Sequence, residues 1–344
     1  MPKVSVIMPV YNVERFVADA VESVLTQSFQ DFELLIVDDR SPDRSITICE
    51  SFDDPRIRIV RHRENRGLAG ARNSGIRHAR GELLAFIDSD DRWTPEKLAL
   101  HVAHLAARPA VGVSFSRSAF INEDNKPNRC YQMPRLTDIE PGYYLCRNPI
   151  GNGSAPVIRR AVFDAIRYRD DLHGEPEDRW FDERLRRSED IECWIRIALT
   201  TDWQIEGIPE ALTLYRLNAG GLSANLLRQL ESWEAVIEKT RSYAPDFIAH
   251  WESRARAFQL RYLARQAIRL YDGAMATRLT HRAFRTDPRI LLREPGRTLT
   301  TLGAAYLLRF TPPSLYAHLE KMAQRAIGAI QTRRISRDLA ARGV

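Results

Sequence analysis

The sequence predicts an α/β fold with a doubly wound, mostly parallel sheet flanked by helices, followed by an α-helical C-terminal extension. Three features support this prediction. Over the first hundred residues, short apolar runs alternate with segments whose apolar residues recur at helical spacing. The connections between these segments are short, as in sheets built from strand–helix–strand units. From residue 226 onward the pattern is mostly helical.

The elements of the N-terminal part follow from this alternation. Continuous apolar runs, typical of strands buried on both faces, occur at 4–10, 32–39, 57–62 and 82–91. Helical patterns lie at 16–25, 46–52 and 69–80. Thr94 is expected to cap a further helix, with Pro95 at its first position. In this architecture ligands bind at the carboxyl ends of the strands, where several aspartates occur: Asp38, Asp39, Asp88, Asp90 and Asp91.

The pattern is looser from residue 111 onward. We expect a strand or a hairpin over 111–121, then a polar stretch that extends to Pro149. Residues 151–166 indicate a loop followed by a helix. A helix capped by Ser188 and a strand over 211–217 come next. The helical region after residue 226 is expected to have breaks near its prolines, Pro245, Pro288, Pro295 and Pro312.

The charge is unevenly distributed along the 344 residues. The formal net charge is +6, but residues 251–344 hold 18 Lys and Arg and only 6 Asp and Glu. The remaining 250 residues therefore carry 33 basic and 39 acidic side chains. This asymmetry favours an anionic partner for the C-terminal region, either a membrane surface or a nucleic acid.

Other features exclude several classes of protein. The four cysteines are too few and too scattered for a disulfide scaffold, and no CxxC pair offers a zinc site. The N-terminus lacks a signal-peptide pattern, and the apolar stretch at 298–308 is about half of the ~20 residues that a spanning helix needs. No GxSxG, P-loop or GxGxxG pattern is present. We therefore expect a protein of a reducing, cytoplasmic compartment that does not cross a membrane by itself.

The acidic cluster DSDD at 88–91 is the first candidate for chemistry. It brings three carboxylates to the end of a buried strand. Clustered carboxylates repel one another, and a hard divalent cation such as Mg²⁺ or Mn²⁺ relieves that repulsion. The alternative is a solvated acidic turn before the next helix.

Four N-terminal segments together resemble the nucleotide-sugar-binding half of the inverting family-2 glycosyltransferases, which have a GT-A fold. They are VSVIMPVYN, VDD at 37–39, GLAGARNSG at 67–75 and FIDSDD. SEDIECWIRIA and ALTLYRLNAGGLS resemble the acceptor-side motifs of the same family. The resemblance covers about residues 3–225. It implies a catalytic domain over 1–225, divided into a nucleotide-sugar-binding half (1–110) and an acceptor-binding half (111–225), followed by a basic helical extension over 226–344.

The resemblance also implies roles for individual residues. Tyr11 would stack on the nucleotide base, and Asp39 would accept a hydrogen bond from the base, the uracil imide in a UDP-sugar. Asp38 either contributes to this contact or supports the loop. Arg72 and the helix-start amides suit a diphosphate. The donor-binding set implied is Pro9, Tyr11, Asn12, Asp38, Asp39, Arg72, Asn73 and Asp88, and the metal set is Asp90 and Asp91, with the direct ligand of the two left open.

A second carboxylate centre is expected at Glu189 and Asp190. Inverting transfer needs a base on the acceptor side, and the resemblance assigns this role to Asp190. The alternative is that two acids in a first helical turn only complement the helix dipole. Two departures from the family matter: Asn218 stands where the family often has His, and no QxxRW motif is present. The second departure favours one sugar per encounter over processive synthesis.

The expected partners are a nucleoside-diphosphate-sugar donor and a glycan or lipid-linked acceptor. In the tail, Ile327, Ile330, Ile335 and Leu339 lie on one side of a helical wheel and three arginines on the other. This pattern is typical of a helix at a membrane surface, and the alternative is a helical cap with a solvated basic face. Two other functions would require different sequence features. A sugar-phosphate nucleotidyltransferase would need a longer glycine-rich loop near the N-terminus, and a nucleic-acid-binding protein would need aromatic residues among the tail arginines.

Overall fold

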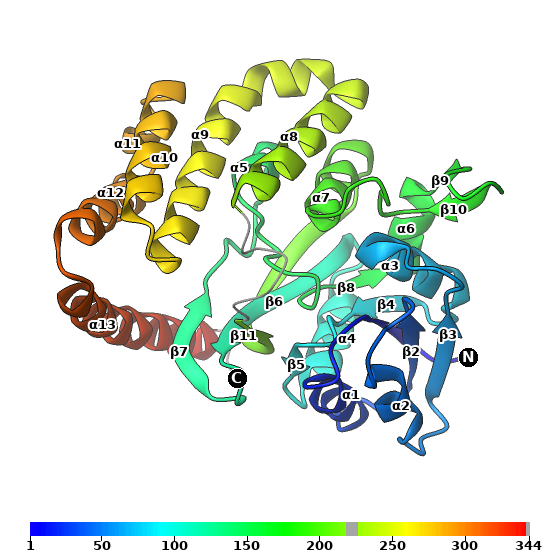
Figure 1. Cartoon of the computed structure of the whole chain (residues 1–344). Helices are drawn as coiled ribbons and strands as arrows, with labels where there is room; N and C mark the ends of the chain where they lie inside the picture. Colours follow the sequence, from blue (N-terminus) through cyan, green and yellow to red (C-terminus); the bar gives the residue numbers. More distant parts are fainter. Residues whose placement is uncertain (218–225, 342–344) are drawn as a thin grey trace. The chain divides into compact units, whose positions relative to one another are not determined.

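The computed structural model describes residues 1–217 and 226–341, which form two compact units. Unit 1 comprises residues 1–139, 149–217 and 331–341, and unit 2 comprises 140–148 and 226–330. Unit 1 is an α/β body with a large central sheet, and unit 2 is helical (Figure 1). Each unit is described by itself.

The sheet of unit 1 has nine strands. Its first part is parallel: β1 (Val4–Val10) pairs with β2 (Phe32–Asp38) on one side and β4 (Leu83–Phe86) on the other, and β3 (Ile57–Arg61) extends β2. Every residue of β1 is buried. The strand order β3–β2–β1–β4 confirms the predicted parallel sheet.

Helices cover both faces of this parallel part. Val6 and Val10 of β1 pack in one core cluster with α1 (Val17–Leu25) and α4 (Lys97–Ala107). Ile7 points to the other face, where α3 (Gly67–His78) lies so close that a Cβ at Gly75 would come within 2.3 Å of the Ile7 side chain. Successive residues of one strand therefore contact helices on opposite faces, as a doubly wound sheet requires. The short α2 (Ser45–Glu50) contacts α1.

The second part of the sheet is mixed. β8 (Val157–Arg159) lies between β4 and β6 (Val111–Ile121) and is antiparallel to both. β6 is a single strand over the whole of 111–121, as the first of the two predicted alternatives has it. It forms a hairpin with β7 (Pro127–Gln132), in the stretch predicted to be polar and irregular, and pairs in parallel with β11 (Gln204–Arg216). The prediction of a loop before the helix α6 (Arg160–Ile166) was therefore wrong at β8. Three residues are too short for a detectable period, and the sheet partners on both sides determine the strand.

The helix predicted to begin at Thr94 begins later. Residues Arg92–Trp93 form β5, which pairs with the end of β11, and the Thr94 amide donates to the Leu212 carbonyl. This tertiary pairing engages the chain as far as Thr94, residues 95–96 then form a turn, and α4 starts at Lys97. The helix predicted after Ser188 is confirmed as α7 (Glu189–Thr200), and a separate small ribbon joins β9 (Tyr168–Asp170) to β10 (Glu177–Arg179).

Unit 2 consists of helices, which confirms the helical C-terminal region. It contains α5 (Pro141–Cys146), α8 (Leu226–Tyr243), α9 (Pro245–Arg269), α10 (Gly273–Thr286), α11 (Ile290–Arg293), α12 (Pro295–Phe310) and most of α13 (Pro313–Ala340). α9 and α12 each begin at a predicted proline, which suits the first helical position because no amide is needed there.

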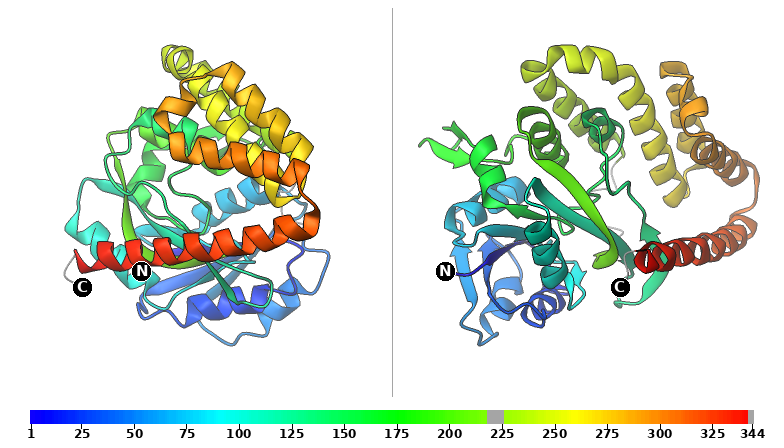
Figure 2. Two further views of the ribbon diagram at one scale, coloured as in Figure 1. Left: turned by 90° about the vertical axis from the view of Figure 1, so that its left-hand side faces the viewer. Right: turned by 180° about the vertical axis from the view of Figure 1, so that it is seen from behind.

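The last turns of α13 belong to unit 1. Asp338 is ion-paired with the buried Arg117 of β6, and the Gln331 side chain bonds both the amide and the carbonyl of Tyr131 in β7. Ile335 and Leu339, expected on an exposed apolar face, are half-buried. Within the described part of the chain, no helix is both long and apolar enough to cross a membrane. Figure 2 shows α13 from two further directions.

Candidate active site

The chain after β1 begins the candidate site. Pro9 is buried within β1, whereas Tyr11, just beyond the strand, has half of its surface exposed (50%). Asn12 adopts a left-handed backbone conformation (φ 56°), and its amide donates to the Ser41 hydroxyl at 2.9 Å. The turn therefore holds the Tyr11 ring at the surface of the strand end, where a flat aromatic face is accessible to a ligand.

The aspartates after β2 have different environments. Asp38 is half-buried, and its Oδ1 accepts from the Ser41 amide at 2.9 Å, which closes the turn. Asp39 is buried, and its two oxygens accept from three groups: the His62 ring and the amides of Arg66 and Gly67. The Asp39 side chain thus holds the backbone at the start of α3.

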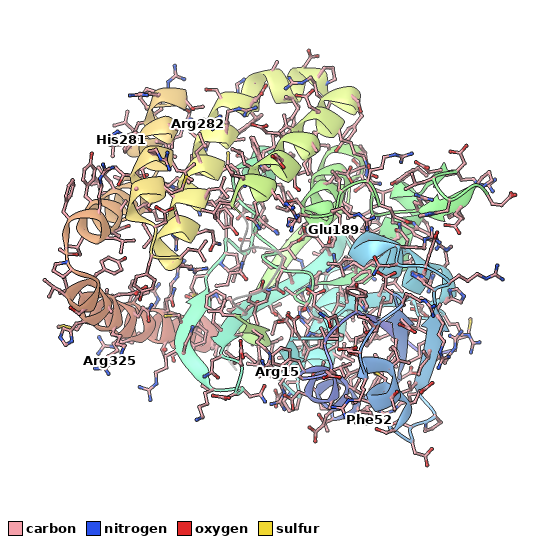
Figure 3. The ribbon with its side chains drawn as sticks, in the orientation of Figure 1. Arg15, Phe52, Glu189, His281, Arg282 and Arg325 are labelled. Atoms are coloured by element: carbon pink, nitrogen blue, oxygen red, sulfur yellow. The ribbon has the colours of Figure 1, made fainter. Side chains whose placement is uncertain are left out.

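Arg72 of α3 joins the two predicted carboxylate centres. Its guanidinium donates to Asp88 Oδ1 at 2.8 Å and to Glu189 Oε1 at 2.6 Å, and only 2% of the residue is exposed. Burial alone would lower the pKa of Arg72, but the carboxylates of Asp88, Glu189 and Asp190 raise it above its usual value. Figure 3 labels Glu189 at the start of α7, on the side facing α3.

Asn73, the neighbour of Arg72, is fully buried and has a different environment. Its Nδ2 donates to the Phe181 carbonyl and to Glu183, and its Oδ1 accepts from the amides of Trp180 and Phe181. These four bonds use the whole hydrogen-bonding capacity of an Asn side chain. Asn73 therefore ties α3 to residues 180–183, and its side chain has no donor or acceptor left for a sugar nucleotide.

The DSDD segment follows β4. Asp88 is half-buried and faces Arg72, whereas Asp91 is 1% exposed and accepts from the Ser154 hydroxyl at 2.6 Å and from the Arg216 amide at 2.9 Å. Burial, with the nearby charges of Asp90 and Asp88, raises the pKa of Asp91 well above its usual range. Asp90 is half-buried, and its backbone carbonyl accepts from Arg216.

The number and accessibility of the carboxylates limit how these residues could bind a cation. Among the described residues, no three His, Cys, Asp or Glu side chains converge as a metal site. Asp91 is 1% exposed and its two oxygens accept hydrogen bonds from Ser154 and Arg216, whereas Asp90 is only half-buried and is therefore the more accessible carboxylate of the pair. One carboxylate is enough for Mg²⁺ or Mn²⁺ when phosphate oxygens and waters complete the shell. The residues present therefore fit a cation that binds together with a diphosphate.

Glu189 and Asp190 occupy the first turn of α7, after Ser188 in a left-handed conformation (φ 60°). Glu189 is buried and Asp190 half-buried. Burial, partly offset by Arg72, raises the pKa of Glu189 to about 7, and burial likewise raises the pKa of Asp190. A carboxylate with a raised pKa is a stronger base than an exposed aspartate, so this turn can accept a proton.

Sequence reasoning missed the segment that supports both centres. A Cβ at Gly153 would lie 2.1 Å from an Arg72 nitrogen, so only glycine lets the guanidinium pass. The Ser154 hydroxyl accepts from the Asp88 amide and donates to Asp91, which joins the two ends of the DSDD turn. Lys97 is also buried and donates to the Ala155 carbonyl. Asn218, the departure noted above, lies outside the described residues.

Comparison with known proteins identifies relatives of this chain. The family model described as "Glycosyl transferase family 2" matches residues 5–167. A relative from Escherichia coli is 40% identical over 235 residues, which are 68% of this chain and 85% of the relative. It is named UDP-Glc:alpha-D-GlcNAc-diphosphoundecaprenol beta-1,3-glucosyltransferase WfgD.

Two solved structures share the fold at low sequence identity. The mannosyltransferase PcManGT from Pyrobaculum calidifontis, in complex with GDP-Man and Mn²⁺, matches with a TM-score of 0.55 at 21% identity, over 89% of this chain and 85% of that one. S. aureus TarS 1-349 in complex with UDP-GlcNAc matches with a TM-score of 0.51 at 18% identity, over 98% and 92%. These similarities confirm the predicted GT-A-like fold.

Proposed function

Because the chain belongs to glycosyl transferase family 2, we propose that it transfers a sugar from a nucleoside-diphosphate donor to a hydroxyl of a glycan or lipid-linked acceptor. We further propose that the donor is a UDP-sugar, that the reaction inverts the anomeric carbon, and that one sugar is added per encounter. The UDP-GlcNAc of the TarS complex and the UDP-Glc in the name of the E. coli relative support the donor, and the lipid-linked acceptor in that name supports the acceptor. The absence of a QxxRW motif supports the addition of one sugar per encounter. Because the chain belongs to this family, we do not retain the two alternatives, a sugar-phosphate nucleotidyltransferase and a nucleic-acid-binding protein.

The observation that carries this proposal is the bridge formed by Arg72. One buried guanidinium holds Asp88, after β4, and Glu189, beside Asp190 on α7, at 2.8 and 2.6 Å. A donor-side carboxylate and the acceptor-side acids are thus fixed relative to each other. Such fixed geometry is what group transfer between two bound substrates requires.

In the proposed reaction, Asp190 removes the proton of the acceptor hydroxyl as its oxygen attacks the anomeric carbon. The new carbon–oxygen bond forms on the face opposite the breaking bond to the diphosphate, which leaves with that electron pair. The raised pKa of Asp190 suits it to take this proton. Arg72 keeps the neighbouring Glu189 in place through their ion pair.

The donor contacts are proposed residue by residue. The exposed Tyr11 ring would stack on the base, and the half-buried Asp38 is better placed than the buried Asp39 for any contact with it. Asp39 and Asn73 are proposed as positioning residues for α3, in place of direct donor contact. Asp90 would hold a divalent cation, which when bound would offset the charge of the departing diphosphate.

Replacing the proposed base tests this function. We expect Asp190→Asn to lower sugar transfer by at least about 10²-fold, because general base catalysis typically contributes 10²–10⁴. Transfer is measured as UDP release from a panel of UDP-sugars with a lipid-linked or short glycan acceptor, and UDP binding by calorimetry. Asp164→Asn, an exposed aspartate of α6, is the control. Normal transfer by Asp190→Asn would contradict the assignment. So would a variant that loses both transfer and UDP binding, because Asp190 would then have a structural role.

A further inference from the structure

Helix α12 carries a stripe of apolar side chains that unit 2 does not bury. Leu299, Tyr306 and Phe310 are exposed, and their spacing of seven and four residues places them on one side of the helix. The opposite side packs into unit 2 through Thr298, Thr301 and Ala305. Phe310 stacks on Tyr306, with ring centroids 6.0 Å apart, but it stays 73% exposed, an unusual degree of exposure for a phenylalanine.

The part of α13 that belongs to unit 2 has a second stripe. Leu315, Leu319 and Met322 are exposed at spacings of four and three residues, and Ile330 lies on the same side two turns further along. The packed side of this segment includes Tyr316, whose ring meets Tyr271 edge-on. In Figure 2 (left), α12 and the first part of α13 run one below the other across the side of unit 2 that faces the viewer.

Basic side chains accompany the two stripes. Residues 289–330 contain six Lys and Arg and two Glu. Both glutamates are engaged within unit 2: Glu294 is paired with Arg147 and Arg261, and Glu320 accepts from the Tyr271 hydroxyl. Exposed cations remain beside the apolar residues, namely Arg309, Lys321 and Arg325, the last of which is labelled in Figure 3.

We propose that the exposed apolar and basic side chains of α12 and of residues 313–330 form a surface that binds an anionic lipid bilayer. Apolar residues that lie among cations match the boundary between acyl chains and anionic headgroups. A second copy of this chain would present the same positive charge, so that pairing two such faces would bring like charges together. The charge therefore favours lipid over self-association.

This surface overlaps in part with the helix face that the sequence pattern predicts. Of that face, Ile327 and Ile330 are exposed, whereas Ile335 and Leu339 are half-buried in unit 1. The exposed apolar residues continue upstream, along residues 313–330 of α13 and onto α12. Its function rests on the proposed activity: an enzyme that glycosylates a lipid-linked acceptor gains by residence at the bilayer, because the acceptor diffuses only there.

Vesicle flotation of the full chain tests the proposal. The probe is phosphatidylcholine vesicles with about 30% phosphatidylglycerol, compared with phosphatidylcholine alone, in the absence of donor and acceptor. The first variant combines Leu299→Ser, Phe310→Ser and Met322→Ser, and the second combines Arg309→Gln, Lys321→Gln and Arg325→Gln. Leu172→Ser and Arg333→Gln, at exposed positions outside the surface, are the matched controls.

We expect the parent chain and both controls to float with anionic vesicles. The apolar variant should lose at least tenfold in its partition coefficient, and the charge variant should bind anionic vesicles no better than neutral ones. Absence of flotation by the parent, or equal flotation by the apolar variant, would overturn the proposal. The proposal would also be overturned if the parent chain binds no vesicles but is a dimer in light scattering, and the apolar variant is a monomer. UDP binding, measured on the same variants, reports separately on the catalytic function.

Discussion

Arg72 and its two carboxylate partners have unequal environments. The arginine is held charged by three acids, while Glu189 lies in a buried position that disfavours its own negative charge. Burying a charge without full compensation costs free energy, and here burial disfavours the ionised form of Glu189. The protonation of Glu189 should therefore be visible in the stability of the protein.

The pKa of Glu189 predicts a pH dependence. A carboxyl group whose pKa is raised to about 7 in the folded protein holds a proton that the unfolded chain, with its pKa near 4.5, has already lost. The free energy of unfolding should therefore fall as the pH rises from about 4.5 to about 7. Glu189→Gln, which cannot ionise, should make this fall shallower, as measured by urea denaturation at pH 5, 6, 7 and 8.

Glu22→Gln, at an exposed position of α1, controls for the loss of a carboxylate as such. Asp91 and Asp190 also have raised pKa values, so part of the change of the unfolding free energy with pH should remain in both variants. An identical slope in Glu189→Gln and the parent chain would show that Glu189 ionises as readily when folded as when unfolded.

At the residue scale, the sequence predicts where the acidic residues of the site lie better than it predicts which groups they bind. The DSDD and ED carboxylates lie at element ends, as predicted, because strand and helix periods determine where those ends fall. The tasks of Asp39 and Asn73 depend on partners elsewhere in the chain, such as the amides of residues 66–67 and 180–181. No local pattern identifies such partners.

At the scale of elements, the loop before β8 is the part of the site that the sequence conceals. GNGS at 151–154 reads as an ordinary turn, yet it passes against Arg72 and holds Asp91 through Ser154. Its position is determined by β8, whose three residues pair on both sides within the sheet. The parallel strands and long helices were predictable because each has enough residues to show its period, whereas β8 and β5 do not.

Gly153→Ala tests the importance of this close approach. The added methyl would overlap the Arg72 guanidinium, which is buried and ion-paired and therefore cannot move aside freely. We expect a loss of about 1–3 kcal/mol in the free energy of unfolding, typical of overpacking, and weaker UDP binding. Gly303→Ala is the matched control, because nothing lies within 4 Å of its added carbon. Equal stability of Gly153→Ala and the parent would show that the loop tolerates a side chain.

At the scale of the whole molecule, donor binding should stabilise the fold. A ligand at a hundred times its dissociation constant stabilises the native state by about 2.7 kcal/mol. We expect UDP with Mn²⁺ or Mg²⁺ to raise the melting temperature, and Asp90→Ala to lose the part of the shift that depends on the metal. Asp124→Ala, at an exposed position in the turn before β7, serves as control. Equal shifts with UDP in EDTA and in Mn²⁺ would argue against a cation, and a shift with GDP alone would change the proposed donor.

The path of the chain between the two units has a practical consequence. Residues 140–148 leave unit 1 and return to it, and residues 331–341 come back to it after the helices of unit 2. A shortened gene that ends near residue 225 would therefore not encode a complete α/β body. It would leave the buried Arg117 without Asp338 and Tyr131 without Gln331. An expression strategy for the catalytic part should delete the intervening helices and rejoin residues 331–341, or neutralise Arg117.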